Sequence, residues 1–219
     1  MTQKQKDVVI GMILGDAYLQ KTGKQNARLR LEHGSSQEEY LLWKVSLLKN
    51  YFQSKIQFLQ RTNPVWKRTY RYVRIQSTSS PEFGKLQRSF YKGSQKVIPE
   101  TITRLFRNPL SLAIWFMDDG YYYPRDKMSY LYIPSFDKES MRYLLEVLKN
   151  NFNLLPTLKI KKKGFVLLFT VSETQKLMTL IKKFIIPSMR YKIPLDPVST
   201  ERNPVPYGTG ESSEIPIKS

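Results

Sequence analysis

Two aspartates, Asp16 and Asp119, each follow a run of apolar residues typical of a buried helix. They stand 103 positions apart (119 minus 16) in a chain of 219 residues, close to half its length. This spacing predicts two similar halves whose apolar helices pair and bring the two carboxylates together. Paired carboxylates can bind Mg²⁺, with Mn²⁺ as a substitute, and a bound metal lowers the pKa of water and neutralises reacting phosphate oxygens. The pattern therefore predicts a metal site for phosphodiester hydrolysis.

The overall charge of the chain indicates a polyanionic partner. It carries 36 Lys and Arg against 18 Asp and Glu, which gives a formal charge of +18 and a pI of about 9.9. This balance is typical of proteins that bind nucleic acid or an anionic membrane surface. The absence of cysteine excludes disulfides and thiolate zinc sites, and the single histidine excludes histidine clusters. We expect that histidine, His33, to be a contact at the end of a strand rather than a metal ligand.

The elements that must hold the two aspartates are expected twice in the same order: helix, two strands, helix, two strands, helix. In the first half we expect helices at 5–16, 35–52 and 81–91, and strands at 18–21, 28–33, 55–61 and 69–77. In the second half we expect a helix after Asn108-Pro109, helices at 137–152 and 174–186, and strands at 121–123, 129–133, 157–163 and 165–171. The order predicts an α+β fold with domains at 1–100 and 101–194, a connector at 99–108 and a Pro/Gly/Ser-rich tail at 195–219.

The exposed faces of the predicted strands are rich in side chains that contact DNA. Basic and polar residues alternate with apolar ones, as expected where one face of a strand packs on a core. Arg, Lys and Gln read base edges in a major groove and neutralise phosphates. A solvated strand is often basic for no functional reason, but several such strands in so basic a chain favour a DNA-binding surface. Its predicted members are Arg28, Arg30, Lys55, Arg61, Tyr72, Arg74, Gln76, Lys159, Lys161 and Lys163.

The two apolar runs also form a repeated motif. Residues 9–17 (VIGMILGDA) and 112–120 (LAIWFMDDG) resemble the nine-residue motif of the LAGLIDADG homing endonucleases, in the single-chain form that carries two motifs. The eighth position of that motif is the metal-binding acid, which the resemblance places at Asp16 and Asp119. Asp118 adds a carboxylate where the family usually has a small residue. We expect Asp118 to support the metal site indirectly or to lie exposed.

The resemblance implies a pseudo-twofold fold of two αββαββα halves with saddle-shaped antiparallel sheets. It implies a monomeric endonuclease that cuts both strands of a long asymmetric DNA target, leaves short 3′ overhangs and supports intron mobility. It also implies a lysine beside each metal site, which polarises water or stabilises charge developing on the phosphate. Lys96 and Lys192 match, since each stands shortly before a proline at the end of its half. We therefore predict that Asp16, Asp119, Lys96 and Lys192 are catalytic.

Two other functions remain open at this stage. A splicing cofactor, or maturase, would use the same scaffold to bind intron RNA, and such proteins can keep the motif helices after losing the acids. Both acids and both lysines are present here, which favours cleavage, and dual function is compatible with them. The third hypothesis is a DNA-binding protein without catalysis, whose function Asp16→Asn and Asp119→Asn would leave unchanged.

The sequence predicts no membrane partner and no export. The longest apolar runs, such as 110–117, are far shorter than the roughly 20 residues of a spanning helix. The polar residues 1–6 lead directly into the first motif, which leaves no room for a signal or transit peptide. We expect the protein to work in a mitochondrion or chloroplast if it is encoded there.

Overall fold

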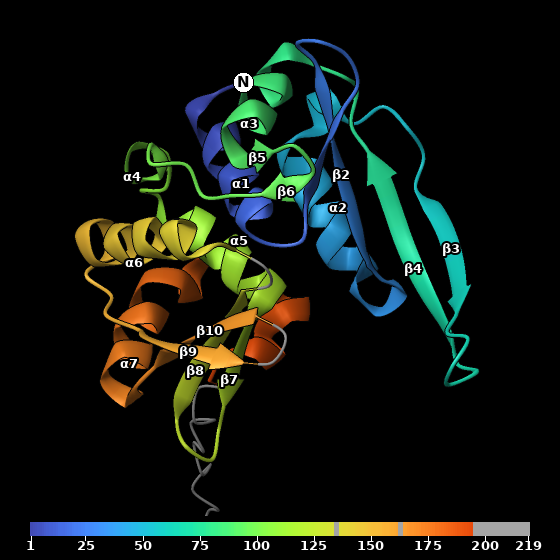
Figure 1. Ribbon diagram of the computed structural model, residues 1–219. Helices are drawn as coiled ribbons and strands as arrows, with labels where there is room; N and C mark the ends of the chain where they lie inside the picture. Colours follow the sequence, from blue (N-terminus) through green and yellow to red (C-terminus); the bar gives the residue numbers. More distant parts are fainter. Residues whose placement is uncertain (134–135, 162–163, 195–219) are drawn as a thin grey trace, which may run out of the picture.

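A pair of apolar helices lies at the centre of the molecule. The structure is a computed structural model that describes residues 1–133, 136–161 and 164–194. In it, helix α1 (Gln3–Leu14) packs against helix α5 (Pro109–Asp119), as Figure 1 shows. The side chains of Thr2 and Asn108 cap the two helices by accepting hydrogen bonds from their first backbone N–H groups. The predicted pairing of the motif helices is confirmed.

Each motif helix is followed by a four-stranded antiparallel sheet. The N-terminal sheet has the strand order β1-β2-β4-β3 and the C-terminal sheet the order β7-β8-β10-β9. The strands are β1 (Tyr18–Lys21), β2 (Ala27–Gly34), β3 (Gln57–Thr62), β4 (Thr69–Gln76), β7 (Gly120–Tyr123), β8 (Met128–Ile133), β9 (Thr157–Lys161) and β10 (Gly164–Phe169). Because the two sheets share one order, the two halves have the same topology. The predicted α+β fold of two repeated halves is confirmed.

Further helices pack around the central pair and the two sheets (Figure 1). The N-terminal half contributes α2 and α3, and the C-terminal half contributes α6 and α7. Their bounds are α2 (Glu38–Leu47), α3 (Pro81–Phe90), α6 (Lys138–Phe152) and α7 (Val171–Ile181). Shorter elements are η1 (Ser35–Gln37), η2 (Lys49–Tyr51), η3 (Lys182–Phe184), η4 (Pro187–Lys192), β5 (Tyr91–Lys92) and β6 (Gln95–Lys96). Within the described ranges, no helix is both long and apolar enough to cross a membrane.

The connector predicted at 99–108 contains a short helix, α4 (Ile102–Leu105). Two details of the sequence prediction were wrong. The helix expected at 35–52 is divided, because Leu48 leaves the helical region with φ −127° and ψ 26°. Lys55 precedes β3 instead of lying within it. The Ser54 hydroxyl donates to the Gln76 carbonyl at 2.7 Å, which ties this approach segment to the end of β4.

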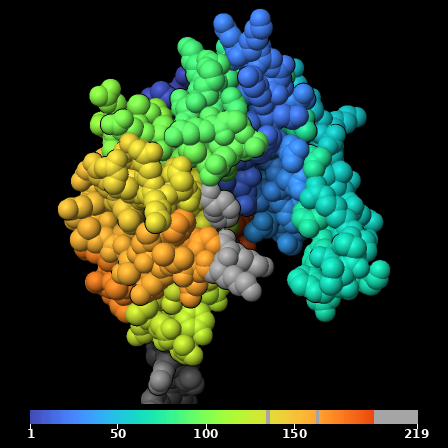
Figure 2. Space-filling view, viewed as in Figure 1, coloured from blue at the N-terminus to red at the C-terminus, as the bar shows by residue number. Residues whose placement is uncertain are grey.

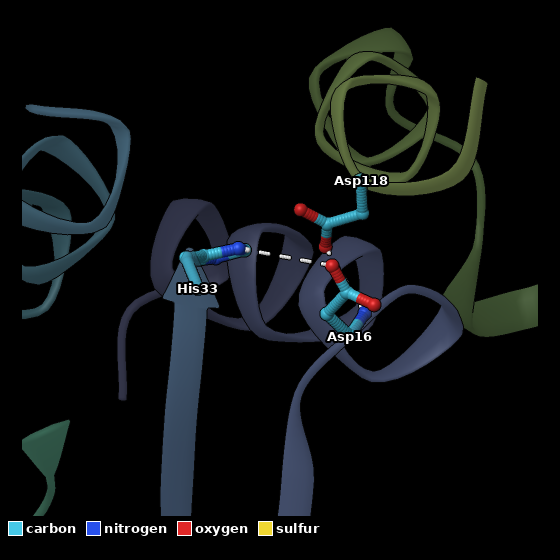
Figure 3. A group of neighbouring side chains, drawn as sticks. All are labelled: Asp16, His33 and Asp118. Carbon is cyan, nitrogen blue, oxygen red and sulfur yellow. Dashed lines mark hydrogen bonds and ion pairs between the residues drawn. The ribbon is translucent and has the colours of Figure 1, made fainter. Parts of the chain in front are cut away.

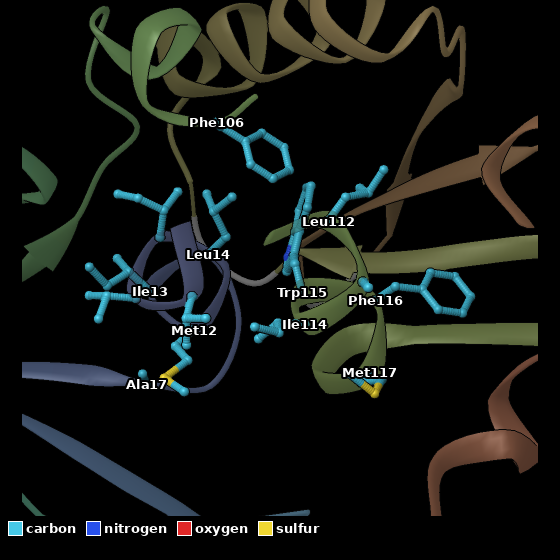
Figure 4. Packing of buried hydrophobic residues seen from close by; sticks show 14 of the residues in the cluster. Met12, Ile13, Leu14, Ala17, Phe106, Leu112, Ile114, Trp115, Phe116 and Met117 are labelled. Atoms are coloured by element: carbon cyan, nitrogen blue, oxygen red, sulfur yellow. The ribbon is translucent and has the colours of Figure 1, made fainter. Parts of the chain in front are cut away.

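Close backbone packing holds the helix pair together. A Cβ atom at Gly11 would lie 2.5 Å from the Ser111 carbonyl oxygen, so only glycine allows this approach. The Ser111 hydroxyl donates to the Asp7 carbonyl at 2.7 Å across the same contact. On α5, Trp115 is fully buried and packs edge-on against Phe106, with 5.9 Å between ring centroids (Figure 4). This packing sets the two helix ends, and the acids that they carry, beside each other.

The two halves leave a hollow between them. Figure 2 shows it between the β3–β4 hairpin and the C-terminal half. The predicted domain boundary near residue 100 stays a prediction, since the central helices of both halves share one apolar core. The predicted tail at 195–219 lies outside the described residues.

Candidate active site

Asp16 lies two residues beyond the last residue of α1, directly after the C-cap Gly15, at the helix pair. Its side chain is 47% exposed, so the carboxylate remains accessible. Its pKa is raised, first because the surrounding protein desolvates it and second because the Asp118 carboxylate is close. Lys44, Lys192 and Lys96 oppose that shift without cancelling it. A carboxylate in this position gains from any cation that approaches it.

Asp119 is the last residue of α5 and lies close enough to Asp16 for the two charges to interact. Burial raises its pKa to about 8, and repulsion from Asp16 and Asp118 adds to that effect. Two under-neutralised carboxylates next to each other are the oxygen donors that Mg²⁺ and Mn²⁺ prefer. The donor chemistry at Asp16 and Asp119 therefore fits a hard divalent cation.

Lys96 caps the end of α1. Its Nζ donates to the carbonyl oxygens of Ile13, Gly15 and Ala17, at 2.8, 2.9 and 3.1 Å. Ile13 lies in the last turn of α1, and Gly15 and Ala17 follow the helix. Carbonyls at such a helix end lack intrahelical partners, and a cation there is also favoured by the helix dipole. Burial lowers the pKa of Lys96, and the nearby aspartates oppose that shift. An ammonium group has three donors, and all three donors of Lys96 bind backbone carbonyls.

Lys192 occupies the matching place in the second half. Its Nζ donates to the Asp118 carbonyl at 2.7 Å, near the end of α5. Burial lowers its pKa as well, with Asp118, Asp119 and Asp16 acting in the opposite direction. Among the described residues this is its one hydrogen bond, so two donors remain for water or phosphate. The structure thus brings Lys96 and Lys192 to the two helix ends, but with unequal freedom.

Asp118 lies inside the helix pair, so the exposed position, one of the two alternatives expected for it, was wrong. Its side chain has no exposed surface. One carboxylate oxygen accepts from the Asp16 backbone N–H at 3.2 Å, and the other pairs with Lys44 Nζ at 2.5 Å. A Cβ atom at Gly15 would lie 2.2 Å from Asp118 Oδ2, so the carboxylate fills the space that glycine leaves. Figure 3 shows it directed toward Asp16 from α5.

His33 completes this polar group at the end of β2. Its Nδ1 lies 3.7 Å from Asp16 Oδ2 (Figure 3). Its Nε2 lies 3.1 Å from Lys44 Nζ. Burial lowers the pKa of His33 to about 4, with Lys44 adding to the shift, so the ring is neutral at pH 7. Asp16, His33 and Asp118 offer ligand atoms within 4.8 Å of one another. Asp118 has both oxygens engaged, which leaves Asp16 as the available carboxylate of the three.

Sequence reasoning missed Lys44. The residue lies on α2 and its side chain is fully buried, with Nζ 4.3 Å from the centre of the Tyr40 ring. The signal was its place on an apolar stripe, since Tyr40, Lys44 and Leu48 are four residues apart and all buried. A lysine on a core stripe needs a buried acid, and Asp118 was the unassigned acid in the motif.

The N-terminal sheet extends a polar surface from Asp16. A groove of about 300 Å³ is lined by Asp16, Tyr18, Arg30, Glu32, His33 and Tyr72 among others. Arg28 donates to Gln76 at 3.1 Å on neighbouring strands. Glu32 accepts from both Arg61 and Arg74 at 2.6 Å, and this raises the pKa of Arg61 and lowers that of Glu32. Five of the predicted residues of this sheet therefore lie in two sets of contacts: Arg28 with Gln76, and Arg61 with Tyr72 and, through Glu32, with Arg74.

The C-terminal sheet presents a different surface. Register pairs Tyr121 with Tyr130, and Tyr132 with Val166, which in turn faces Lys159 on β9. Tyr121 and Tyr132 are exposed. Lys159 and Lys161 lie on β9 as expected, while Lys163 lies outside the described residues. A role in DNA binding stays a prediction for the residues of both sheets.

The fold and the pair of helix-end acids define a class of nucleic-acid-cutting proteins, and comparison with known proteins agrees. The model of the LAGLIDADG DNA endonuclease family matches residues 6–177. The chain therefore belongs to that family. Its two-motif, single-chain architecture is that of the homing endonucleases within it.

Individual relatives support the same assignment. The chain is 27% identical over 198 residues to the "Probable intron-encoded endonuclease 1" of Wickerhamomyces canadensis, covering 88% of this chain and 85% of that protein. It is 28% identical over 192 residues to the cytochrome b mRNA maturase bI2 of Debaryomyces hansenii, covering 85% of this chain and 72% of that one. Among solved structures, the homing endonuclease I-WcaI bound to its DNA recognition sequence is similar with a TM-score of 0.81 and 27% identity, over 89% of this chain and 88% of the other.

Proposed function

We propose that this protein is a divalent-metal-dependent, site-specific endonuclease that cuts both strands of a long asymmetric DNA target. The observation that carries the proposal is the pair of acids, Asp16 and Asp119, at adjoining helix ends. Both have raised pKa values in a chain of net charge +18. Unneutralised carboxylates are costly to bury unless a cation binds them. The similarity to an endonuclease bound to its recognition sequence supports the same function.

Asp16 and Asp119 would hold Mg²⁺, or Mn²⁺ in its place. The bound metal supplies an acidified water and neutralises charge on the reacting phosphate oxygens. Lys192, with donors to spare, is placed to stabilise negative charge that develops on the phosphate. Lys96 holds the end of α1 and so fixes the Asp16 backbone. Asp16 and Asp119, one from each half, would each serve one DNA strand.

The two sheets would contact the DNA on either side of these acids. On the N-terminal sheet, the groove beside Asp16 carries Arg30 and Tyr72, and the neighbouring Glu32 network preorganises Arg61 and Arg74. On the C-terminal sheet, Lys159 and Lys161 are exposed on β9 and would meet phosphates. Because the faces differ, the preferred target is asymmetric. We further propose that the protein acts as a monomer, with its halves at 1–100 and 101–194, and leaves short 3′ overhangs.

The decisive experiment is cleavage of a randomised double-stranded DNA library with Mg²⁺, followed by sequencing of the broken ends. Discrete ends at one long sequence are expected from the wild-type protein. The Asp16→Asn, Asp119→Asn double variant is the matched control, because it keeps side-chain size and removes both charges. The proposal is overturned if that variant yields the same ends.

A maturase activity is the second candidate function. It is supported by the similarity to the maturase of Debaryomyces hansenii. Similarity to intron-encoded and cytochrome b maturase proteins also supports a role in intron mobility and a place of action in an organelle. Binding of the host intron RNA by filter retention, with and without competing target DNA, tests it. Retained RNA binding in the Asp16→Asn, Asp119→Asn variant would show a splicing surface that does not need the acids.

A further inference from the structure

A row of polar side chains, Asp118, Lys44 and His33, runs through the interior and ends at Asp16; we call it the polar row. Asp118 pairs with Lys44, Lys44 contacts His33, and His33 faces Asp16. Lys44 and Asp118 have no exposed side-chain surface, and His33 is 4% exposed. Asp118 also accepts a hydrogen bond from the Asp16 backbone N–H, so both ends of the polar row contact Asp16.

The chemistry of Lys44 fixes the state of the His33 ring. An ammonium group can only donate a hydrogen bond. With Lys44 Nζ 3.1 Å from Nε2, that nitrogen of the neutral ring must accept. The ring proton then resides on Nδ1, the nitrogen 3.7 Å from Asp16 Oδ2. The opposite tautomer would point two donors at each other and a lone pair at a carboxylate.

The described residues of the second half contain no counterpart of this polar row. In the motif, Gly15 takes the place that Asp118 takes in the second copy. Tyr18 pairs with Arg30, and Tyr121 pairs with Tyr130, so these pairs align the two sheets. Three residues beyond each partner lie His33 and Ile133. The polar ring is therefore replaced by a buried aliphatic side chain.

The helix that matches α2 also differs. Helix α6 buries Leu144, Val147 and Leu148 completely. Within the part of the chain that the structure describes, Ser140 is the one polar side chain of α6 that is buried. No buried lysine of α6 is therefore available to orient a group near Asp119.

Stability alone does not explain the polar row. A buried ion pair gains about as much from attraction as it loses in desolvation, and an apolar pair of similar volume is often equally stable. The second half shows such an apolar solution at the matching positions. A polar arrangement beside Asp16 alone therefore indicates a function that concerns the Asp16 site alone.

We propose that Lys44, held by Asp118, is a positioning residue of the Asp16 site alone: it sets the His33 tautomer so that the N–H faces the Asp16 carboxylate. The Asp119 site lacks this device, so the two acids are not equivalent. The effect on DNA cleavage rests on the proposed endonuclease function, whereas the tautomer does not.

The first arm of the test needs neither DNA nor metal. Because the chain has one histidine, ¹⁵N-histidine labelling yields the two nitrogens of a single ring. At pH 7 the wild-type protein should carry its proton on Nδ1. In the Lys44→Met, Asp118→Asn double variant, which removes both charges and keeps an acceptor for the Asp16 N–H, the fraction of ring with its proton on Nε2 should rise, because only Asp16 then favours the Nδ1 proton. A proton on Nε2 in the wild type, or an unchanged tautomer in the variant, overturns the proposal.

The second arm measures each DNA strand separately. With differently labelled strands, the double variant should cut one strand about tenfold more slowly, the scale typical of residues that orient a metal ligand. The other strand should change by less than about twofold, so nicked DNA accumulates. The Lys85→Met variant, at an exposed lysine of α3, is the control and should cut both strands normally. Equal slowing of both strands, or of neither, overturns the proposal.

The His33 variants refine the result. Asn places its amide N–H near the position of Nδ1, whereas Gln places it near Nε2. His33→Asn should therefore keep balanced cutting, and His33→Gln should show the same strand bias as the double variant. If the wild-type protein cuts no DNA at all, the endonuclease function fails while the tautomer measurement still decides the role of Lys44.

Discussion

The two halves of this molecule share a topology and a pair of acids, but they surround those acids differently. The Asp16 side has a buried lysine, a neutral histidine and an internal carboxylate, whereas the Asp119 side is packed with aliphatic residues. The N-terminal sheet presents charged side chains on β2 and β4, whereas the C-terminal sheet presents tyrosines on β7 and β8 and lysines on β9. The repeat therefore preserves where the acids lie, while the chemistry around each has diverged.

The largest expected effect comes from removing either acid. Asp16→Asn or Asp119→Asn should lower double-strand cleavage by about a thousandfold or more, because each loses a charge that a divalent cation requires. DNA affinity should change little, since the basic sheets are intact. Strand-resolved cleavage and a gel-shift titration with Ca²⁺ measure the two quantities. Normal cleavage by either variant would contradict the metal assignment.

The two lysines test the comparison at the helix ends. Lys192→Met should slow cleavage by about a hundredfold, because its unused donors can reach the reacting phosphate. Lys96→Met should instead destabilise the fold by about 1–3 kcal/mol, since it removes the donor to three carbonyls at and just beyond the end of α1. Cleavage rates together with urea unfolding separate the two effects. The reverse assignment, with Lys96 dominant in rate and Lys192 in stability, would contradict this reasoning.

The raised pKa of Asp119 makes the metal-free protein sensitive to pH. Its folded pKa of about 8 exceeds the unfolded value of 3.8, so between these values the folded state binds the proton more strongly. Stability from this group is therefore present at low pH and is lost as pH rises toward 8. In EDTA at pH 7.5, the free energy of unfolding of Asp119→Asn should exceed that of the wild type by about 2 kcal/mol, so the variant should melt at a higher temperature. The gain should shrink at pH 5, and thermal melts at both pH values measure it.

A destabilising acid at an active site is expected when the site is built for a cation. Adding Mg²⁺ should reduce the advantage of Asp119→Asn, because the wild-type protein alone gains binding energy at this carboxylate. An Asp119→Asn variant that is less stable than the wild type in EDTA would show that the carboxylate is neutralised by other means.

The order of the elements could be predicted from the sequence because it depends on local patterns. The apolar runs, the caps and the alternating strands each lie within about ten residues. The acids and the paired lysines could also be placed, since they repeat with the halves. Lys44 could not be connected to Asp118 in this way, because they are 74 positions apart and the contact depends on how α2 packs against α5.

The same limit explains the other differences. Lys55 follows the polar alternation of a strand, but the Ser54 bond to the end of β4 holds it outside the ladder. The freedom of Lys192 compared with Lys96 depends on which carbonyls the tertiary structure brings within reach. Such differences arise from packing between distant segments, which residue spacing does not encode.

The smallest expected effect concerns the two sheet faces. Arg30→Ala on the N-terminal sheet should weaken target binding by about 1 kcal/mol and reduce the salt dependence of the affinity, because a phosphate or base contact and its counterion release are lost. Tyr132→Phe on the C-terminal sheet should leave the salt dependence unchanged, since it removes no charge. Fluorescence anisotropy at several salt concentrations distinguishes them. Equal salt slopes for wild type and Arg30→Ala would mean that this arginine does not contact DNA.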